Sequence, residues 1–422
     1  MRLLTKWTRM WLTRSREPFT FTNEYDEKLQ YADCDQLGLY VHIPFCKKIC
    51  PFCPYCKTVY EEKVCKEYLQ SLLEEIRLVG AEYLEKTGEK KRTTSLYFGG
   101  GTPALVADRL KEIVDTLQEY FIITEGIGVE LHPDNVTVET LQVLKDAGVT
   151  KISIGVQSFH EKYQHILGRK SVDAEGMAAA LKAVPFETVS MDFIFALPAQ
   201  TFDDLKEDVD KAFACGANHV AMYPFIDFTF TESEVPTMKK REKRRLLDEI
   251  TRYCLEKGCE RNSIWTFARE KQAGYSSMTR DNFLGFGCSA TTLLKGQFKV
   301  NTFSVEAYCK RIAEKKLPTS LTIRFTKRQR MVYYLFWTAY STRVHQADFE
   351  KFFGVPLKKM YGFEIFVAKL LGFVKERKKG VYEMTLKGAF YYHHYENYYT
   401  LAYIDKMWGI MRKEAFPERL EL

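Results

Sequence analysis

Hydrophobic positions in the first half of the chain alternate between short β-branched runs and longer stretches with helical spacing. The short runs lie at 38–43, 94–98, 127–131, 151–155, 189–195 and 219–224, and the amphipathic stretches between them lie at 62–86, 107–120, 137–146, 173–183 and 202–215. Strands that alternate with helices predict parallel strands joined by helical crossovers. Six such units predict an α/β fold, a partial (β/α)6 TIM-like barrel over residues 37–235. Chemistry in such barrels sits at the carboxyl ends of the strands.

Three further regions flank the predicted barrel. We expect a basic arm over residues 1–36, a connection with a glycine-rich segment over residues 236–320, and a C-terminal domain over residues 321–422. In that last domain, three helical stretches precede a lysine-rich turn, which predicts an α+β winged-helix-like module followed by an aromatic-rich helix. Winged helices often bind nucleic acid, and they also serve as caps over active sites.

Composition narrows the class of protein. The 422 residues are 46% hydrophobic, so the chain can bury a large core, and it contains no apolar run of membrane-spanning length. Its 11 cysteines lack the regular framework of a small secreted protein, which predicts a reducing cytoplasm. The net charge of +7 permits an anionic partner but selects none.

The basic arm has two interpretations. Apolar Leu4, Trp7 and Trp11 recur at helical spacing, with basic residues elsewhere on the same helix. This pattern fits peripheral contact with an anionic membrane, and it equally fits an arm that packs across the barrel. A secretory signal is not indicated, because basic residues interrupt the apolar stretch and no small-residue cleavage site follows.

Three cysteines in an apolar and aromatic run carry the strongest chemical signal. Cys46, Cys50 and Cys53 have the spacing C-x3-C-x2-C. Thiolates suit iron–sulfur clusters or zinc. A four-iron cluster normally takes four cysteines, so three would leave one iron free for a substrate or cofactor. The triplet therefore predicts an open [4Fe-4S] cluster, with zinc as the alternative.

This triplet and the run before it, Tyr-Val-His-Ile-Pro-Phe-Cys, resemble the radical S-adenosylmethionine (SAM) enzymes. More narrowly, they resemble the branch of oxygen-independent coproporphyrinogen III oxidase, the related haem chaperone and the anaerobic haem-degrading methyltransferases. The resemblance implies a cluster on the three cysteines, one or two SAM molecules cleaved to a 5′-deoxyadenosyl radical, and a flavodoxin- or ferredoxin-type electron donor. It also makes Tyr40 and His42 candidate catalytic residues, with Tyr40 and Phe52 packed around the cluster.

Further motifs follow successive strands in the order that this family shows. They are Gly-Gly-Gly-Thr-Pro, a strand-end glutamate, Gly-Val-Gln with Leu-Gly-Arg, an aspartate in the fifth strand and a tyrosine in the sixth. The resemblance assigns contact with SAM to Gly100, Gly101, Thr102, Glu130, Gln157, Arg169, Asp192 and Tyr223. Glycines allow close backbone approach, and an arginine can grip a carboxylate. From the residues alone, Glu130 could equally be a structural ion pair and Arg169 a solvated side chain.

Several positions depart from the family pattern. Cys56 lies one residue later than the fourth cysteine of the oxidase, so we expect an unligated thiol there. The oxidase has Tyr-Ala-His where this chain has Tyr223-Pro-Phe, and the chaperone's haem-binding His-Asn-x-x-Tyr-Trp is not found. Ala196 replaces a glycine, and Cys288, in the glycine-rich segment, is a weak candidate for a reactive thiol. Both named activities lose support, whereas the radical chemistry does not.

The aromatic tail at 391–403 either packs into a core or lines a pocket for a large flat substrate. His393 and His394 could bind haem iron, although adjacent histidines more often lie on a surface. We expect a cytoplasmic radical SAM oxidoreductase or methyltransferase that acts on a tetrapyrrole under a winged-helix-like cap, with no nucleic-acid partner. The alternatives are a methyl or methylene transferase acting on a lipid or natural product, and a haem chaperone without turnover.

Overall fold

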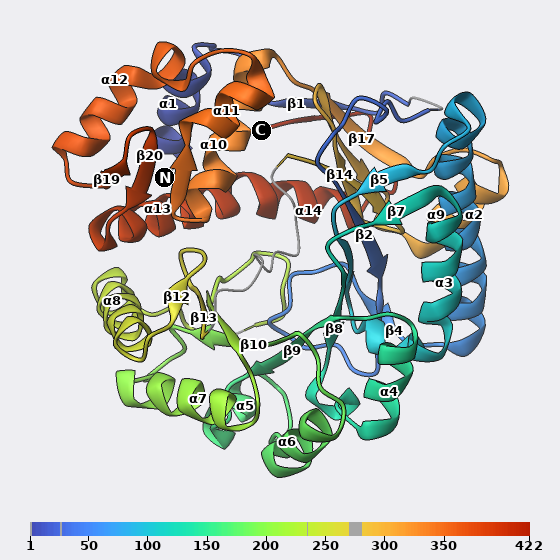
Figure 1. Cartoon of the computed structure of the whole chain (residues 1–422), viewed down its shortest axis with the longest axis horizontal. Coiled ribbons are helices and arrows are strands. Elements are labelled where there is room, and N and C mark those ends of the chain that lie inside the picture. The colour runs from blue at the N-terminus through green and yellow to red at the C-terminus, as the bar shows by residue number, and fades with distance from the viewer. Residues whose placement is uncertain (1, 26–27, 234, 270–280) are drawn as a thin grey trace.

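The computed structural model describes residues 2–25, 28–233, 235–269 and 281–422. A curved parallel sheet forms one side of the molecule (Figure 1). Its neighbouring strands run in the order β2 (Leu37–Ile43), β6 (Leu96–Gly100), β8 (Ile127–Leu131), β9 (Lys151–Gln157), β10 (Thr188–Phe195) and β11 (His219–Pro224). Every neighbouring pair in this series is parallel. The six strands predicted from the hydrophobic pattern are therefore confirmed.

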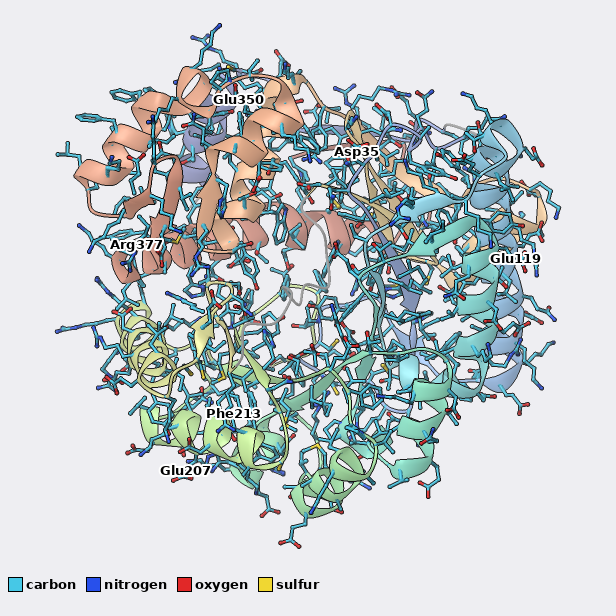
Figure 2. The ribbon with its side chains drawn as sticks, viewed as in Figure 1. Asp35, Glu119, Glu207, Phe213, Glu350 and Arg377 are labelled. Carbon is cyan, nitrogen blue, oxygen red and sulfur yellow. The ribbon has the colours of Figure 1, made fainter. Side chains whose placement is uncertain are left out.

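Helices cover the outer face of this sheet. They are α2 (Glu62–Thr87), α3 (Ala107–Tyr120), α4 (Val138–Asp146), α5 (Glu161–Ile166), α6 (Ala174–Ala183) and α7 (Phe202–Ala214). Each turns one apolar stripe inward, as amphipathic crossover helices do. Figure 2 illustrates this division with Phe213 of α7, which is buried, and Glu119 of α3, which lies exposed at the periphery.

The sheet continues beyond the predicted barrel on both sides. Next to β2 lies a seventh parallel strand, β14 (Asn282–Phe286). Antiparallel strands then follow in the order β15 (Thr291–Leu293), β16 (Gln297–Asn301), β17 (Thr319–Arg324), β1 (Thr20–Thr22) and β21 (Arg419–Glu421). The opposite edge carries β13 (Thr266–Ala268) and β12 (Glu260–Arg261). Among the described residues the two edges do not pair, which agrees with the predicted partial barrel. Strand β14 escaped the sequence analysis because it contains no β-branched residue and Gly285 interrupts it.

The C-terminal region has a winged-helix-like part and a helical tail. The first comprises α10 (Lys327–Tyr340), β18 (Arg343–His345), α11 (Gln346–Phe353), α12 (Leu357–Leu370), β19 (Val374–Lys378) and β20 (Val381–Met384). The tail comprises α13 (Leu386–Tyr399), a π-helical turn at Thr400–Ile404 and α14 (Asp405–Met411). Figure 1 shows this region across the molecule from α3 and α4. π-helical turns occur frequently at functional sites.

The N-terminal arm meets the C-terminal region. Helix α1 (Arg2–Thr13) packs against α10 and α13, and β1 pairs with β17 and β21. The first half of the arm therefore packs away from the parallel strands, whereas Tyr31, in its second half, packs on the barrel against Val79 of α2 and against Phe121. Among the helices that the structure describes, none is both long and apolar enough to cross a membrane.

The remaining elements are short connections and two further helices. They are β3 (Phe45–Cys46), β4 (Thr58–Val59), β5 (Lys91–Thr93), β7 (Phe121–Ile123), α8 (Lys240–Glu256) and α9 (Val305–Ala313). The strands β3 and β4 pair with each other and hold together the two ends of the loop that carries Cys50 and Cys53. This loop follows the carboxyl end of β2, where the sequence predicts the chemistry.

Candidate functional site at the carboxyl ends of the strands

The three predicted cluster cysteines lie on one loop and are contacted from two others. Cys46, Cys50 and Cys53 are half-buried free thiols. The Thr102 hydroxyl lies 3.9 Å from Cys46 Sγ, and Arg169 Nε donates to Cys50 Sγ at 3.4 Å. Thr102 follows β6 and Arg169 follows β9, so the fold brings three separate segments together around the sulfur atoms.

The electrostatics of these thiols fit a metal cluster. Burial raises the pKa of Cys46 to about 11 and also raises the pKa of Cys53. A buried thiolate is stable only beside positive charge or hydrogen-bond donors, and metal binding displaces its proton. Three thiols outside any disulfide, with an arginine and a hydroxyl directed at two of them, match the ligand set and the outer hydrogen bonds of an iron–sulfur cluster.

The glycine loop after β6 packs closely against the cysteine loop. Gly100 has a φ of +120°, and a Cβ there would lie 2.7 Å from the His42 ring. The N–H groups of Gly101 and Thr102 donate to the carbonyls of Ile43 and Phe45, both at 2.8 Å. Because these N–H groups are already engaged, this loop would hold an ammonium group, such as that of SAM, through its carbonyls.

The two predicted carboxylates, Glu130 and Asp192, lie near each other in this site. The groups that donate hydrogen bonds to them are neutral. Glu130 accepts from the Tyr97 hydroxyl at 3.1 Å and from the Gly100 N–H at 3.2 Å. Burial raises its pKa to about 7, and the charge of Asp192 adds to this effect. Burial likewise raises the pKa of Asp192 to about 6, against the hydrogen bonds from Ser153 and Ser190. A bound cation would favour the ionised form of both groups.

Gln157 and Arg169 meet at the end of β9. Gln157 has a φ of +71°, and its side chain lies over Gly155, where a Cβ would be 3.0 Å from Gln157 Nε2. Arg169 donates to the Gly155 carbonyl at 2.5 Å and lies over the Phe52 ring at 5.5 Å. The solvated alternative for Arg169 is therefore wrong, because its guanidinium is held between the β9 end and the cluster loop.

Tyr40 and His42 lie on the same face of β2. The Tyr40 hydroxyl and His42 Nδ1 are 3.0 Å apart, and the Tyr40 ring stacks on Tyr97. Burial raises the pKa of Tyr40. A Cβ on Gly99 would touch both Tyr40 and Glu130, so these two side chains converge. His42 is only 4% exposed and is held by its contact with Tyr40; its catalytic role stays a prediction.

Tyr223 and Ala196 lie at the ends of β11 and β10. Tyr223 is 40% exposed, and its ring meets Trp265 at 6.3 Å; no contact joins it to the cluster loop in the described part of the chain. Ala196 has a φ of +69°, a conformation that glycine adopts without strain. This explains physically why the family has glycine at that position.

The C-terminal helices add contacts that the sequence did not indicate. Trp408 of α14 meets Tyr55 of the cluster loop at 6.0 Å, and Arg412 donates to the Pro54 carbonyl. His393 is buried against Trp265 and Phe195, so the expectation of a surface histidine is wrong for His393. Burial lowers its pKa to about 3. These contacts form between segments that are distant in the sequence, and no local sequence pattern predicts them.

Comparison with known proteins shows which family the barrel resembles. Residues 40–212 match the radical SAM superfamily. The chain therefore contains a radical SAM domain over these residues. A radical SAM domain implies a [4Fe-4S] cluster and SAM, and the residues gathered around Cys46, Cys50 and Cys53 fit both.

The relatives of this radical SAM protein belong to the expected branch. The chain is 29% identical to "Heme chaperone HemW" of Bacillus subtilis over 69% of this chain and 80% of that protein. It is 26% identical to oxygen-independent coproporphyrinogen III oxidase of Cereibacter sphaeroides, over 67% of this chain and 68% of that protein. It is 27% identical to anaerobilin synthase of Escherichia coli O157:H7, over 69% of this chain and 68% of that protein.

A solved structure confirms the fold. The structure of coproporphyrinogen III oxidase (HemN) from Escherichia coli matches with a TM-score of 0.74 at 21% identity, covering 88% of this chain and 93% of that one. At this identity the likeness concerns the fold, and it extends past the barrel into the C-terminal region.

Proposed function

We propose that this radical SAM protein is an enzyme that cleaves SAM on a cluster held by Cys46, Cys50 and Cys53 and acts on a tetrapyrrole. When bound, the cluster supplies the electron that cleaves SAM to a 5′-deoxyadenosyl radical. The observation that carries the proposal is the convergence of Thr102 and Arg169 on the cysteine sulfurs beside two carboxylates with raised pKa values.

The protein residues have separable tasks in this proposal. Thr102 and Arg169 hold the cluster loop and donate hydrogen bonds to its sulfurs. Glu130 and Asp192 accept hydrogen bonds from the cationic and hydroxyl groups of SAM, and Gln157 can both donate and accept. Phe52, Tyr40 and Tyr223 provide ring surfaces around the cofactor.

The aromatic side chains that join the ends of the strands to α13 form a surface suited to a tetrapyrrole. Three relatives carry names that refer to heme, coproporphyrinogen or anaerobilin. Aromatic contacts join the ends of the strands to α13: Phe195 to His393, Trp265 to His393 and Tyr223 to Trp265. Flat aromatic side chains are suited to a large conjugated ring. The winged-helix-like part would serve as the cap over this aromatic surface.

Product analysis with reconstituted protein tests the proposal. The protein is supplied anaerobically with reductant, SAM and either coproporphyrinogen III or haem, and Cys53→Ala serves as the cluster-free control. Tetrapyrrole-dependent 5′-deoxyadenosine with loss of carbon dioxide would identify a decarboxylase. 5′-Deoxyadenosine together with S-adenosylhomocysteine would identify methyl transfer with two SAM molecules. Absence of tetrapyrrole-dependent SAM cleavage would contradict the proposed enzyme activity.

A haem chaperone is the second candidate, because the chain covers 80% of a "Heme chaperone HemW". It predicts haem binding without substrate-dependent 5′-deoxyadenosine. Binding is measured by the haem absorption spectrum, and transfer by activation of an apo-haemoprotein. If SAM cleavage is instead stimulated by a lipid or natural product and not by a ring, the methyl or methylene transferase alternative is favoured.

An acidic electron donor of the flavodoxin or ferredoxin type would fit the surface of the cluster loop. Lys47 and Lys48 are exposed between Cys46 and Cys50, so their charge lies beside the proposed cluster. The charge-reversal variant K47E/K48E is expected to slow turnover driven by flavodoxin, because electrostatic complementarity steers association. Turnover driven by dithionite should be unchanged; equal slowing with both reductants would contradict this docking site.

Peripheral membrane contact remains a proposal for the arm. Trp7 and Trp11 of α1 are 66% and 50% exposed, and Phe363 and Phe366 of α12 are 60% and 61% exposed. Trp11 and Phe363 lie 6.1 Å apart, so the two helices share one apolar surface. Co-sedimentation with anionic vesicles should fall in the W7A/W11A variant. Equal sedimentation of variant and native protein would contradict membrane contact through these two tryptophans.

A further inference from the structure

A second group of soft ligands lies behind the cluster loop. His42 on β2, Cys56 at the end of the cluster loop and Cys288 after β14 come from three distant segments, yet their ligand atoms all lie within 4.8 Å of one another. His42 is 4% exposed, Cys288 is fully buried and Cys56 is half-buried. Two sulfurs and one imidazole nitrogen enclosed in this way form a potential metal site that includes none of the three cluster cysteines.

His42 directs Nε2 at this group. Nε2 lies 3.0 Å from the Cys56 carbonyl oxygen and 3.2 Å from the Ser289 hydroxyl. Because a carbonyl only accepts, Nε2 carries the proton in the metal-free protein, and Nδ1, 3.0 Å from the Tyr40 hydroxyl, accepts from it. Metal binding at Nε2 would move the proton to Nδ1, where the Tyr40 oxygen can accept the hydrogen bond. Histidines that bind metals are commonly oriented by a hydrogen bond from the other nitrogen.

Cys288 lies in a turn between two residues with positive φ. Gly287 and Ser289 have φ values of +98° and +56°, which is unusual for two positions so close together. The Gly287 N–H donates to Glu75 Oε2 at 2.7 Å, and the Cys288 N–H donates to the Tyr68 hydroxyl at 3.1 Å. A Cβ on Gly287 would lie 2.8 Å from the His42 carbonyl oxygen. The backbone therefore approaches His42 as closely as glycine permits.

Both thiols must release a proton to bind a metal ion. Cys56 Sγ donates to the Phe303 carbonyl oxygen at 3.3 Å, and Cys288 is fully buried. Metal binding displaces the protons of thiol ligands, so both protons would leave when the ion binds.

We propose that His42, Cys56 and Cys288 bind one Zn²⁺ ion, separate from the iron of the cluster. Tetrahedral zinc with two thiolates and one imidazole would place these atoms about 3.5–3.8 Å apart, which small rotations of the side chains can reach. Three protein ligands leave the fourth position to the neighbouring Ser289 hydroxyl or to water. The ion would tie the end of the cluster loop to β2 and to the β14 turn.

Metal analysis of the anaerobically reconstituted protein tests this proposal. Native protein is incubated with equimolar Zn²⁺, passed over a desalting column and analysed for zinc and iron. About one zinc per chain is expected in addition to the cluster iron. In C56A and C288A the zinc should fall at least about tenfold with iron unchanged. The buried Cys254 lies on α8, away from this group, so C254A is the matched control and should retain zinc.

Cobalt substitution provides a readout that does not depend on the cluster. In the C46A/C50A/C53A variant, Co²⁺ should still produce the visible bands of a tetrahedral thiolate site, and adding C56A should abolish them. Zinc that is absent from native protein, or that is lost equally from C254A, would overturn the proposal. So would zinc that displaces iron from the cluster, or a Cys56–Cys288 disulfide found by thiol counting in protein kept under reducing conditions.

Discussion

Two buried carboxylates, Asp204 in the outer helical layer and Glu130 at the carboxyl end of β8, differ in the partners that surround them. Asp204, at the start of α7, accepts from Lys162 at 2.7 Å and from the Tyr163 hydroxyl at 2.7 Å. Burial opposes ionisation of Asp204, but the hydrogen bonds from Lys162, Thr201 and Tyr163 outweigh it and lower the pKa. Among the described residues, the hydrogen-bond donors to Glu130 are a phenol and a backbone amide, and burial raises its pKa to about 7.

This difference separates stability from binding. At Asp204 the chain itself supplies the cation, Lys162, that a buried carboxylate needs. At Glu130 and Asp192 the hydrogen bonds described above come from neutral groups, so a cationic ligand would stabilise these carboxylates. We infer that Asp204 serves folding, whereas Glu130 and Asp192 serve the cofactor.

Removing a cluster ligand should have the largest effect. In Cys53→Ala, SAM cleavage should fall about a thousandfold or more, which corresponds to about 4 kcal/mol in the activation free energy, because the cluster loses one of its three thiolates. SAM cleavage by dithionite-reduced protein is the measurement, with C254A as the control. Cleavage within tenfold of the native rate would assign the cluster to other cysteines.

Replacing each of the two carboxylates by its amide should affect binding in one case and stability in the other. Glu130→Gln should weaken SAM binding about 10–100-fold, because a charged hydrogen bond contributes roughly 1.5–3 kcal/mol. Asp204→Asn should leave binding intact but lower the free energy of unfolding by about 2–3 kcal/mol, since it removes the Lys162 ion pair and part of a helix cap. Calorimetric binding and urea unfolding measure the two effects; weaker binding in D204N alone would reverse the comparison.

Binding should depend on pH through Glu130. Its raised pKa means that the carboxyl is largely protonated below about 7, so affinity for cationic SAM should rise about tenfold between pH 6 and 8. The apo protein should show the opposite trend: the native state binds the additional proton, so stability falls as pH rises from the ordinary glutamate value towards 7. E130Q should flatten both profiles. A pH-independent affinity in native protein would remove Glu130 from the SAM site.

The smallest effect expected is that of Tyr97→Phe. The Tyr97 hydroxyl donates to Glu130 and lowers its pKa, so its loss should move the midpoint of the binding profile to higher pH by about one unit. Maximal affinity at high pH should change little, because Glu130 keeps the Gly100 N–H. A midpoint shifted to lower pH would mean that the hydroxyl does not stabilise the ionised form.

Local sequence patterns predicted the parts of the site that lie close together along the chain. The spacing of Cys46, Cys50 and Cys53 and the glycine run after β6 are local features, and the family resemblance supplied Glu130, Gln157 and Asp192 one strand at a time. Roles for these side chains remain proposals. The cofactor class was accessible for the same reason, because each motif follows its own strand and parallel strands bring their carboxyl ends together.

By itself the sequence determined the six parallel strands, five of their six covering helices and the cluster loop, because hydrophobic periodicity and motif spacing act over short stretches of chain; the six-residue α5 is too short to show such a pattern. The tertiary structure alone decided that α1 contacts the C-terminal helices, that β14 extends the sheet and that His393 is buried. It also decided that Cys56 and Cys288 meet at His42, which neither residue's surroundings in the sequence indicate. These contacts join segments from opposite halves of the chain, and they form only when the burial of a shared core outweighs the entropy of closing long loops.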